Sequence, residues 1–257
     1  MKNLKNKIVF ITGASAGIGK ATAYKFAEAG CNLVLTARRL NILEEIKADI
    51  EKKYNVRVYI AQLDVTNNND VVNVINNLPA EFKNIDILFN NAGLAKGLEK
   101  LYLDDPNNWD IMIDTNIKGL LYVTRAILPG MVERKSGHII NMGSIAGRNP
   151  YTKGAVYCAT KHAELAITQA LRADLLGTNV KVSTVDPGMV ETEFSIVRFN
   201  GDINKAKDVY KGIKPLVAED IADIVFWIAT TPDHVCINEV VVTPTAQANS
   251  YYNYREE

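Results

Sequence analysis

The sequence predicts an α/β protein built on one parallel, doubly wound sheet, and three observations lead to this fold class. The composition is that of a globular chain, because 47% of the 257 residues are hydrophobic and only 23% are charged. Short β-branched runs alternate with longer segments of helical period. Several of the runs, such as 8–11 and 33–35, are continuously apolar, as strands are when helices cover both faces of a sheet. We therefore predict a single domain over residues 1–257, with seven parallel strands and helices on both faces.

The predicted elements follow one another along the whole chain. Strands are expected at 8–11, 33–35, 56–60, 85–89, 139–140, 180–185 and 240–242, with a helix at 218–230 before the last of them. Two further helical segments, 107–131 and 154–176, carry apolar residues on more than one side. They either pack on both the sheet and another subunit or are simply buried.

Two segments fall outside this alternation. Residues 189–215 have no clear period and would overhang the carboxyl ends of the strands, so we expect them to form a mobile substrate lid. The C-terminal tail, residues 246–257, holds three tyrosines and no regular pattern. It is either a frayed end or a segment that docks on another subunit.

Charge and cysteine usage exclude several classes of function. The 29 basic and 29 acidic side chains cancel, which argues against binding to nucleic acid or to an anionic membrane. The three cysteines are far apart and the three histidines are scattered, so neither a disulfide framework nor a metal site is expected. No apolar run has the length of a signal peptide or a membrane span. We expect a cytoplasmic protein.

A glycine-rich turn directly after the first strand predicts a Rossmann-like dinucleotide site. The turn runs from Thr12 to Gly19 and opens a helix. Its glycines permit a tight bend and a close approach of the backbone to a pyrophosphate, which the free N–H groups of the helix start would bind. The residues expected to bind there are Gly13, Ser15, Gly17, Ile18 and Gly19.

The end of the second strand indicates which dinucleotide is bound. Arg38 and Arg39 stand where an acidic residue would accept a hydrogen bond from the ribose 2′-hydroxyl of NAD. An arginine instead suits the 2′-phosphate of NADP, because a guanidinium forms bidentate, charge-assisted contacts. The alternative is that both arginines merely begin an exposed helix. We predict NADP as the cofactor.

The part of the chain that follows the fifth strand contains three residues that indicate acid-base chemistry. Tyr157 and Lys161 are four residues apart, so they share one face of the predicted helix 154–176, and Ser144 precedes them. A phenol is a poor proton donor at neutral pH, since its ordinary pKa is ~10. A neighbouring ammonium stabilises the phenolate and makes the phenol acidic enough to act. The Ser144 hydroxyl can hydrogen-bond the substrate oxygen.

These motifs resemble those of the short-chain dehydrogenase/reductase family over nearly the whole chain. The matching residues are Thr12-Gly-Ala-Ser-Ala-Gly-Ile-Gly19, Asn90-Asn-Ala-Gly93, Asn116, Ser144, Tyr157-Cys-Ala-Thr-Lys161 and Pro187-Gly188. The resemblance implies a catalytic tetrad of Asn116, Ser144, Tyr157 and Lys161, in which Asn116 holds a water and Lys161 also binds the nicotinamide ribose. It further implies cofactor contacts from Asp64, Val65, Asn91, Ala92, Gly93, Pro187, Gly188, Val190 and Thr192.

Within that family the chain resembles one branch most. Three stretches, 143–148, 187–194 and 244–247, are similar to those of the NADP-dependent 3-hydroxy acid and serine dehydrogenases. This resemblance implies oxidation of serine, allo-threonine, 3-hydroxypropionate or 3-hydroxybutyrate, and assembly as a homotetramer. Two alternatives stay open: an NADPH-dependent reductase of neutral carbonyls or diketones, and a non-catalytic NADP-binding sensor.

A hydroxy acid carries a carboxylate, so its binding site needs a cation. The two candidates are Arg148, in the loop after Ser144, and Arg198, in the predicted lid. Arg148 is nearer to Ser144 in the sequence. We expect one of the two to hold the acid.

Overall fold

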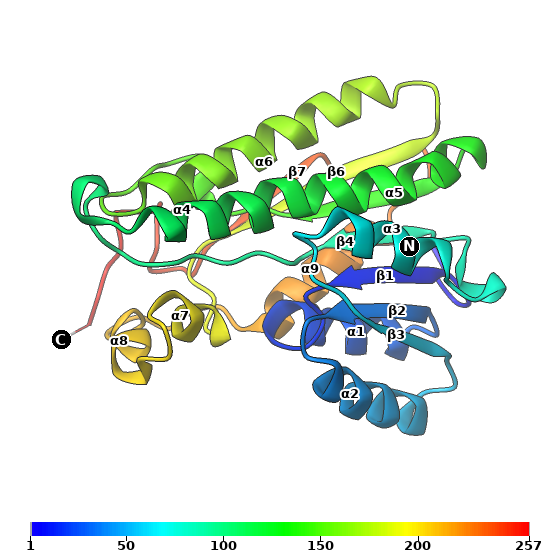
Figure 1. Ribbon diagram of the computed structural model, residues 1–257, viewed down its shortest axis with the longest axis horizontal. Helices are drawn as coiled ribbons and strands as arrows, with labels where there is room; N and C mark the ends of the chain where they lie inside the picture. Colours follow the sequence, from blue (N-terminus) through cyan, green and yellow to red (C-terminus); the bar gives the residue numbers. More distant parts are fainter. Residues whose placement is uncertain (1, 257) are drawn as a thin grey trace.

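The predicted fold class is confirmed by the computed structural model of the protein, which describes residues 2–256 (Figure 1). Met1 and Glu257, the bounds of the predicted domain and tail, lie outside the described residues. Seven parallel strands form one sheet in the order β3-β2-β1-β4-β5-β6-β7. The strands are β1 (Ile8–Thr12), β2 (Asn32–Ala37), β3 (Val58–Gln62), β4 (Ile87–Asn90), β5 (Gly137–Met142), β6 (Val180–Pro187) and β7 (Glu239–Val242).

Helices cover both faces of this sheet (Figure 1). They are α1 (Gly17–Glu28), α2 (Leu40–Lys53), α3 (Asn68–Asn76), α4 (Pro106–Ile113), α5 (Leu120–Glu133), α6 (Ala155–Asp174), α7 (Glu193–Arg198), α8 (Ile203–Asp208) and α9 (Ala218–Ala229). Apolar side chains of α1, α2 and α9 form one core cluster with the sheet. Those of α3, α5 and the end of α6 form a second cluster on the opposite face.

The first strand illustrates why the sequence folds in this way. Every residue of β1 is buried. Val9 and Ile11 belong to one core cluster, whereas Ile8 and Phe10 belong to the other. Because side chains alternate across a strand, a strand packed on both faces carries apolar residues at successive positions, as 8–11 do. The continuous apolar runs therefore predicted the central strands correctly, and their bounds differ from the prediction by only a few residues.

Two segments differ from the predicted elements. The helix expected at 107–131 is interrupted by a π-helical turn, Asp114–Gly119, between α4 and α5. The segment 189–215 contains two short helices, α7 and α8, where no regular period was evident. The side chains of Thr192 and Asp202 cap their first turns, so local hydrogen bonds stabilise helices too short for periodicity to reveal.

The tail packs back on its own chain beside α8 (Figure 1). The guanidinium of Arg255 donates to the carbonyls of Val209 and Lys211, and the Glu256 amide donates to the Gly212 carbonyl. The described part of the tail is thus joined to the segment that follows α8. Within residues 2–256, no helix combines the length and the apolar character needed to cross a membrane.

A buried histidine in β5 makes the stability of the fold sensitive to acid. His138 is 4% exposed, and Ser183 is its side-chain partner at 2.8 Å. Burial, together with the charges of Lys181 and Lys2, lowers the pKa of His138 to about 3. Between pH 6.5 and about pH 3, His138 binds a proton in the unfolded chain but not in the folded protein. The free energy of unfolding is therefore fully retained above pH 6.5 and falls as the pH drops through this window.

We predict that His138→Gln reduces this acid sensitivity. Between pH 6.5 and pH 5 the histidine should account for about 2 kcal/mol of lost stability, since each pH unit corresponds to ~1.4 kcal/mol per proton. Urea denaturation of the wild type and the variant at several pH values measures the difference. The exposed His234, changed to Gln, is the matched control. A wild type and a His138→Gln variant with parallel pH dependence would contradict the prediction.

Candidate active site

A cavity of about 940 Å³ opens at the carboxyl ends of the strands. Ligands of doubly wound sheets bind at this edge, at the point where the strand order reverses. Here the order reverses between β1 and β4. The predicted residues that line the cavity are Gly13, Ser15, Gly17, Ile18, Arg38, Arg39, Asp64, Val65, Asn91, Ala92, Gly93, Ser144, Tyr157, Lys161, Pro187, Gly188, Val190, Thr192 and Arg198. Gly19, Asn116 and Arg148 do not line it.

The glycine-rich turn has the shape that a dinucleotide requires. Gly13 and Gly17 adopt φ values of +63° and +50°, a region that L side chains rarely adopt. A Cβ on Gly19 would lie 2.5 Å from the Gly13 carbonyl oxygen, so only glycine allows α1 to start this close to the turn. No side chain caps α1. Its first N–H groups are thus left to bind an anion such as a pyrophosphate.

Hydrogen bonds join this turn to the end of β4. The Thr12 hydroxyl accepts from the amides of Asn91 and Ala92 at 3.0 and 2.9 Å. The side-chain amide of Asn91 in turn donates to the carbonyls of Thr12 and Gly13 at 3.0 and 3.2 Å. The two loops that bound the cavity are therefore fixed relative to each other.

The two arginines after β2 are exposed at the rim of the cavity. Arg39 donates to the Ser15 hydroxyl at 3.1 and 3.2 Å and pairs with Glu193 of α7 at 2.9 Å. Arg38 has no ion pair among residues 2–256. A phosphate placed between Ser15 and these guanidinium groups would meet charge-assisted donors. This arrangement fits the 2′-phosphate of NADP.

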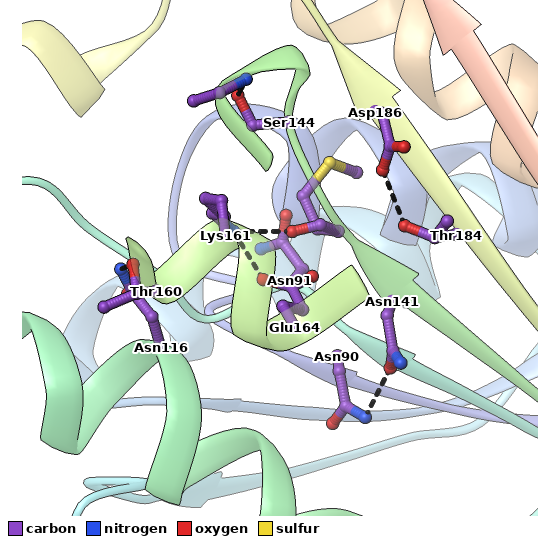
Figure 2. A network of polar contacts seen from close by, with 12 residues as sticks. Asn90, Asn91, Asn116, Asn141, Ser144, Thr160, Lys161, Glu164, Thr184 and Asp186 are labelled. Carbon is purple, nitrogen blue, oxygen red and sulfur yellow. Dashed lines mark hydrogen bonds and ion pairs between the residues drawn. The ribbon is translucent and has the colours of Figure 1, made fainter. Parts of the chain in front are cut away.

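Tyr157 and Lys161 lie on one face of α6, and Ser144 follows β5. The Lys161 ammonium donates to the Met142 carbonyl at 2.7 Å and to the Glu164 carboxylate at 2.8 Å (Figure 2). The Ser144 hydroxyl oxygen accepts from the Ala146 amide at 3.1 Å, which leaves its hydrogen free to donate. The ring of Tyr157 contacts that of Phe194 with centroids 5.7 Å apart.

Asn116 lies behind these groups, in the π-helical turn, and is 2% exposed. Its side chain accepts from the Leu94 amide at 2.9 Å and donates to the Leu94 carbonyl at 2.8 Å and to Thr160 at 3.1 Å (Figure 2). A π turn shifts the register of a helix and often occurs at functional sites. Here it directs Asn116 toward α6 and the loop after β4.

Burial dominates the electrostatics behind the cavity. It raises the pKa of Glu164 to about 7, although the Lys161 ammonium opposes the rise. Burial disfavours the Lys161 charge, but Glu164 and Tyr157 more than offset this effect and raise the pKa of Lys161. Burial also raises the pKa of Asp186, against the opposing contacts of Thr184 and Arg148.

The two candidate cations have different surroundings. The Arg148 Nε donates to Asp186 at 2.7 Å, and its terminal nitrogen pairs with both Asp186 and Glu239. The sequence suggested that Arg148 is the candidate cation nearer to the reacting groups. The structure corrects this expectation, because Arg148 does not line the cavity and its guanidinium pairs with Asp186 on β6 and Glu239 on β7.

Arg198 lines the cavity instead. Its guanidinium lies 5.4 Å from the ring centre of Tyr157 and 5.5 Å from that of Tyr151, and it donates to the Tyr151 hydroxyl. Its Nε donates to the Gly97 carbonyl at 3.2 Å. Within residues 2–256, Arg198 has no ion-pair partner.

Sequence reasoning missed Glu164, Asp186 and Tyr151. Glu164 could have been noticed, because it follows Lys161 by three residues and so shares its helix face. Asp186 lies near the end of β6, directly before Pro187-Gly188, which is a weak signal. Nothing in the sequence indicated that Tyr151 would contact Arg198, since the two lie in loop and lid segments whose conformations have no periodic pattern.

Comparison with known proteins gives independent information on this site. A family model described as short chain dehydrogenase matches residues 7–201. An NADP-dependent 3-hydroxy acid dehydrogenase of Schizosaccharomyces pombe is 45% identical over 258 residues, which is 100% of both chains. Sulfoacetaldehyde reductase 2 of Chromohalobacter salexigens is 46% identical over 246 residues, 95% of this chain and 97% of that one.

A solved structure resembles the fold closely. The closed form of serine dehydrogenase complexed with NADP⁺ superimposes with a TM-score of 0.92. Its sequence is 46% identical, and the match covers 97% of this chain and 100% of that one.

We predict that Arg148→Leu destabilises the fold. Asp186 has a side chain only 3% exposed and would lose its cation, which should cost about 2–3 kcal/mol. Urea denaturation measures the loss. Arg198→Leu is the matched control, because Arg198 has no ion-pair partner among residues 2–256 and should cost less. Equal stability of wild type and Arg148→Leu would contradict this role.

Proposed function

The chain belongs to the short-chain dehydrogenase family, and from that premise we propose that it is an NADP-dependent oxidoreductase of small 3-hydroxy acids. The reaction interconverts the 3-hydroxyl group and a carbonyl. The single observation that supports this substrate class is the position of Arg198, which has no carboxylate partner among residues 2–256, against the ring of Tyr157.

The chain's residues suit the cofactor. When bound, NADP supplies or accepts the hydride. The glycine turn and the uncapped start of α1 would hold its pyrophosphate, and Ser15, Arg38 and Arg39 would hold its 2′-phosphate. The walls from Asn91 to Gly93 and from Pro187 to Thr192 lead from that end of the cavity to Tyr157.

Three residues would handle the proton. Tyr157 gives a proton to the substrate oxygen during reduction and takes one from the hydroxyl during oxidation. The Ser144 hydroxyl donates to the same oxygen, since its oxygen accepts from the Ala146 amide and its hydrogen is left to donate. The Lys161 ammonium favours the phenolate. Asn116 is a positioning residue in this scheme, since it fixes Leu94 and Thr160 around the helix that carries Tyr157 and Lys161.

The anionic end of the substrate would bind Arg198. When the reacting oxygen lies at Tyr157, the rest of a small acid extends into the space that Tyr151 and Arg198 border. Two of the relatives act, by their names, on a 3-hydroxy acid and on sulfoacetaldehyde. In both compounds a single carbon atom separates the anionic group from the reacting carbon. That shared spacing supports a cation next to Tyr157 as the basis of specificity.

Further features accompany this proposal. Residues 189–215 act as the lid that brings Arg198 and Phe194 over the substrate. The protein assembles as a homotetramer, for which the exposed Ile111 and Leu121 on the outer side of α4 and α5 provide apolar surface. Cys31, Cys158 and Cys236 are free thiols, as suits a protein of the cytoplasm.

We predict that the protein oxidises 3-hydroxy acids and that Tyr157→Phe loses at least about 10²-fold in kcat, because general acid-base catalysis typically contributes 10²–10⁴-fold. Turnover is followed by NADPH absorbance with serine, allo-threonine, 3-hydroxypropionate, 3-hydroxybutyrate, sulfoacetaldehyde and neutral diketones. NADPH binding, followed by fluorescence, should persist in the variant.

The outcomes separate the alternatives. No turnover with any compound would favour a sensor, and preference for diketones would favour a reductase of neutral carbonyls. A Tyr157→Phe enzyme that is folded and still fully active would exclude the proposed proton transfer.

We predict that Arg198→Leu raises KM for the acids about 10- to 100-fold, the loss expected for a charge-assisted contact of 1.5–3 kcal/mol. KM for a neutral diketone should stay close to the wild-type value. Steady-state kinetics with both substrates measures the contrast, and Arg148→Leu is the control that removes an arginine outside the cavity. An unchanged KM for acids in Arg198→Leu would rule out this contact.

A further inference from the structure

Glu164 is a buried acid that the proton transfer described above does not use. It lies on α6, three residues after Lys161, and is 2% exposed. One carboxylate oxygen accepts from the Lys161 ammonium at 2.8 Å. The other is buried without a hydrogen-bond partner among residues 2–256. A buried carboxylate with an unsatisfied oxygen is costly, so its position beside Lys161 calls for a physical explanation.

Glu164 restricts the orientation of the ammonium. An ammonium has three N–H donors, and here the Met142 carbonyl and Glu164 take two of them (Figure 2). Gly93 borders the third side, since a Cβ on that residue would lie 3.7 Å from the Lys161 nitrogen. Gly93 also lines the cavity, so the third N–H donor of Lys161 is the one that can reach a group bound there.

Glu164 also controls how much positive charge reaches Tyr157. An ionised carboxylate at 2.8 Å cancels much of the field of the Lys161 ammonium. The other charged group facing it is Asp186 on β6, which Arg148 and Thr184 hold. β5 contributes the neutral Met142 carbonyl to the Lys161 ammonium, and the Asp114–Lys118 pair of the π turn is half exposed. Among residues 2–256, Lys161 is the one cation that forms an ion pair with Glu164.

We propose that Glu164 is a positioning residue that tunes the proton transfer through Lys161: as a carboxylate it weakens the pull of the ammonium on the Tyr157 phenolate, and on taking up a proton it restores that pull. The inference rests on the proposed roles of Tyr157 and Lys161. Because burial raises the pKa of Glu164 to about 7, its charge changes within the range in which the enzyme is assayed.

The test compares pH profiles of kcat/KM for oxidation of the best hydroxy acid, from about pH 6 to 10, in the wild type and Glu164→Gln. Glutamine keeps an oxygen that accepts from Lys161 but has no negative charge. The phenolate then forms more readily, so the whole profile should move to lower pH by about one unit, the lower end of the shifts that a neighbouring charge produces. The base limb for carbonyl reduction should move in the same direction.

Two further variants make the result decisive. Asp174→Asn removes the same charge from an exposed position of α6, about 15 Å farther along the helix, and should leave the profile in place. Glu164→Asp keeps a carboxylate one methylene farther from Lys161 and should shift the profile in the same direction by less. It decides the question if the Gln variant does not fold.

The outcomes distinguish this inference from the proposed function. Superimposable profiles of the wild type, Glu164→Gln and Glu164→Asp would overturn the role of Glu164, as would a lower plateau without a shift, which indicates structural support only. If Tyr157→Phe were fully active, the proposed proton transfer itself would fail, whatever Glu164→Gln does.

Discussion

The site depends on the reversal of strand order between β1 and β4. Helices leave the sheet in opposite directions from these two neighbouring strands, and the loops that follow them separate to form the cavity. The separation is fixed by hydrogen bonds between Thr12 and Asn91. Glycine is required on the β1 side of this junction, since a side chain on Gly13 would approach Asn91 and Ala92 within 3.0–3.1 Å. Both ends of the cavity, one at the glycine-rich turn and the other at Tyr157, are positioned relative to this junction.

Behind that cavity, among residues 2–256, the side chains of Lys161, Glu164 and Asp186 are buried, and each has a charged partner. Lys161 and Glu164 form one pair on α6, and Asp186 and Arg148 form another between β6 and the loop after β5. A buried pair costs desolvation energy that its mutual attraction only partly offsets, so such pairs are poor devices for stability alone. They do fix ammonium, carboxylate and backbone in one arrangement. This rigidity suits the proton transfer proposed for Tyr157.

The sequence predicted the parts of the molecule that short-range patterns determine. Apolar runs such as 9–11 located the strands, the glycine-rich turn after β1 marked one end of the cavity, and the spacing of Tyr157 and Lys161 placed them on one helix face. It could not predict the π turn at Asn116, because a one-residue change in helix register leaves no periodic signal. Nor could it choose between Arg148 and Arg198. That choice depends on Asp186 and Glu239, which are distant in the sequence and meet Arg148 only in the folded sheet.

The arginines of this chain show that partners, rather than residue type, determine a side chain's role. Arg148 is surrounded by two carboxylates and therefore has no charge left for a ligand. Arg39 contacts both Ser15 and Glu193, so it connects the glycine-rich turn to α7. Arg198 has aromatic rings and a carbonyl around it, and these contacts orient the guanidinium without neutralising it. An orientated but uncompensated cation next to Tyr157 has an excess of positive charge. In the proposed function, the anionic group of the substrate, one carbon removed from the reacting carbon, would balance this charge.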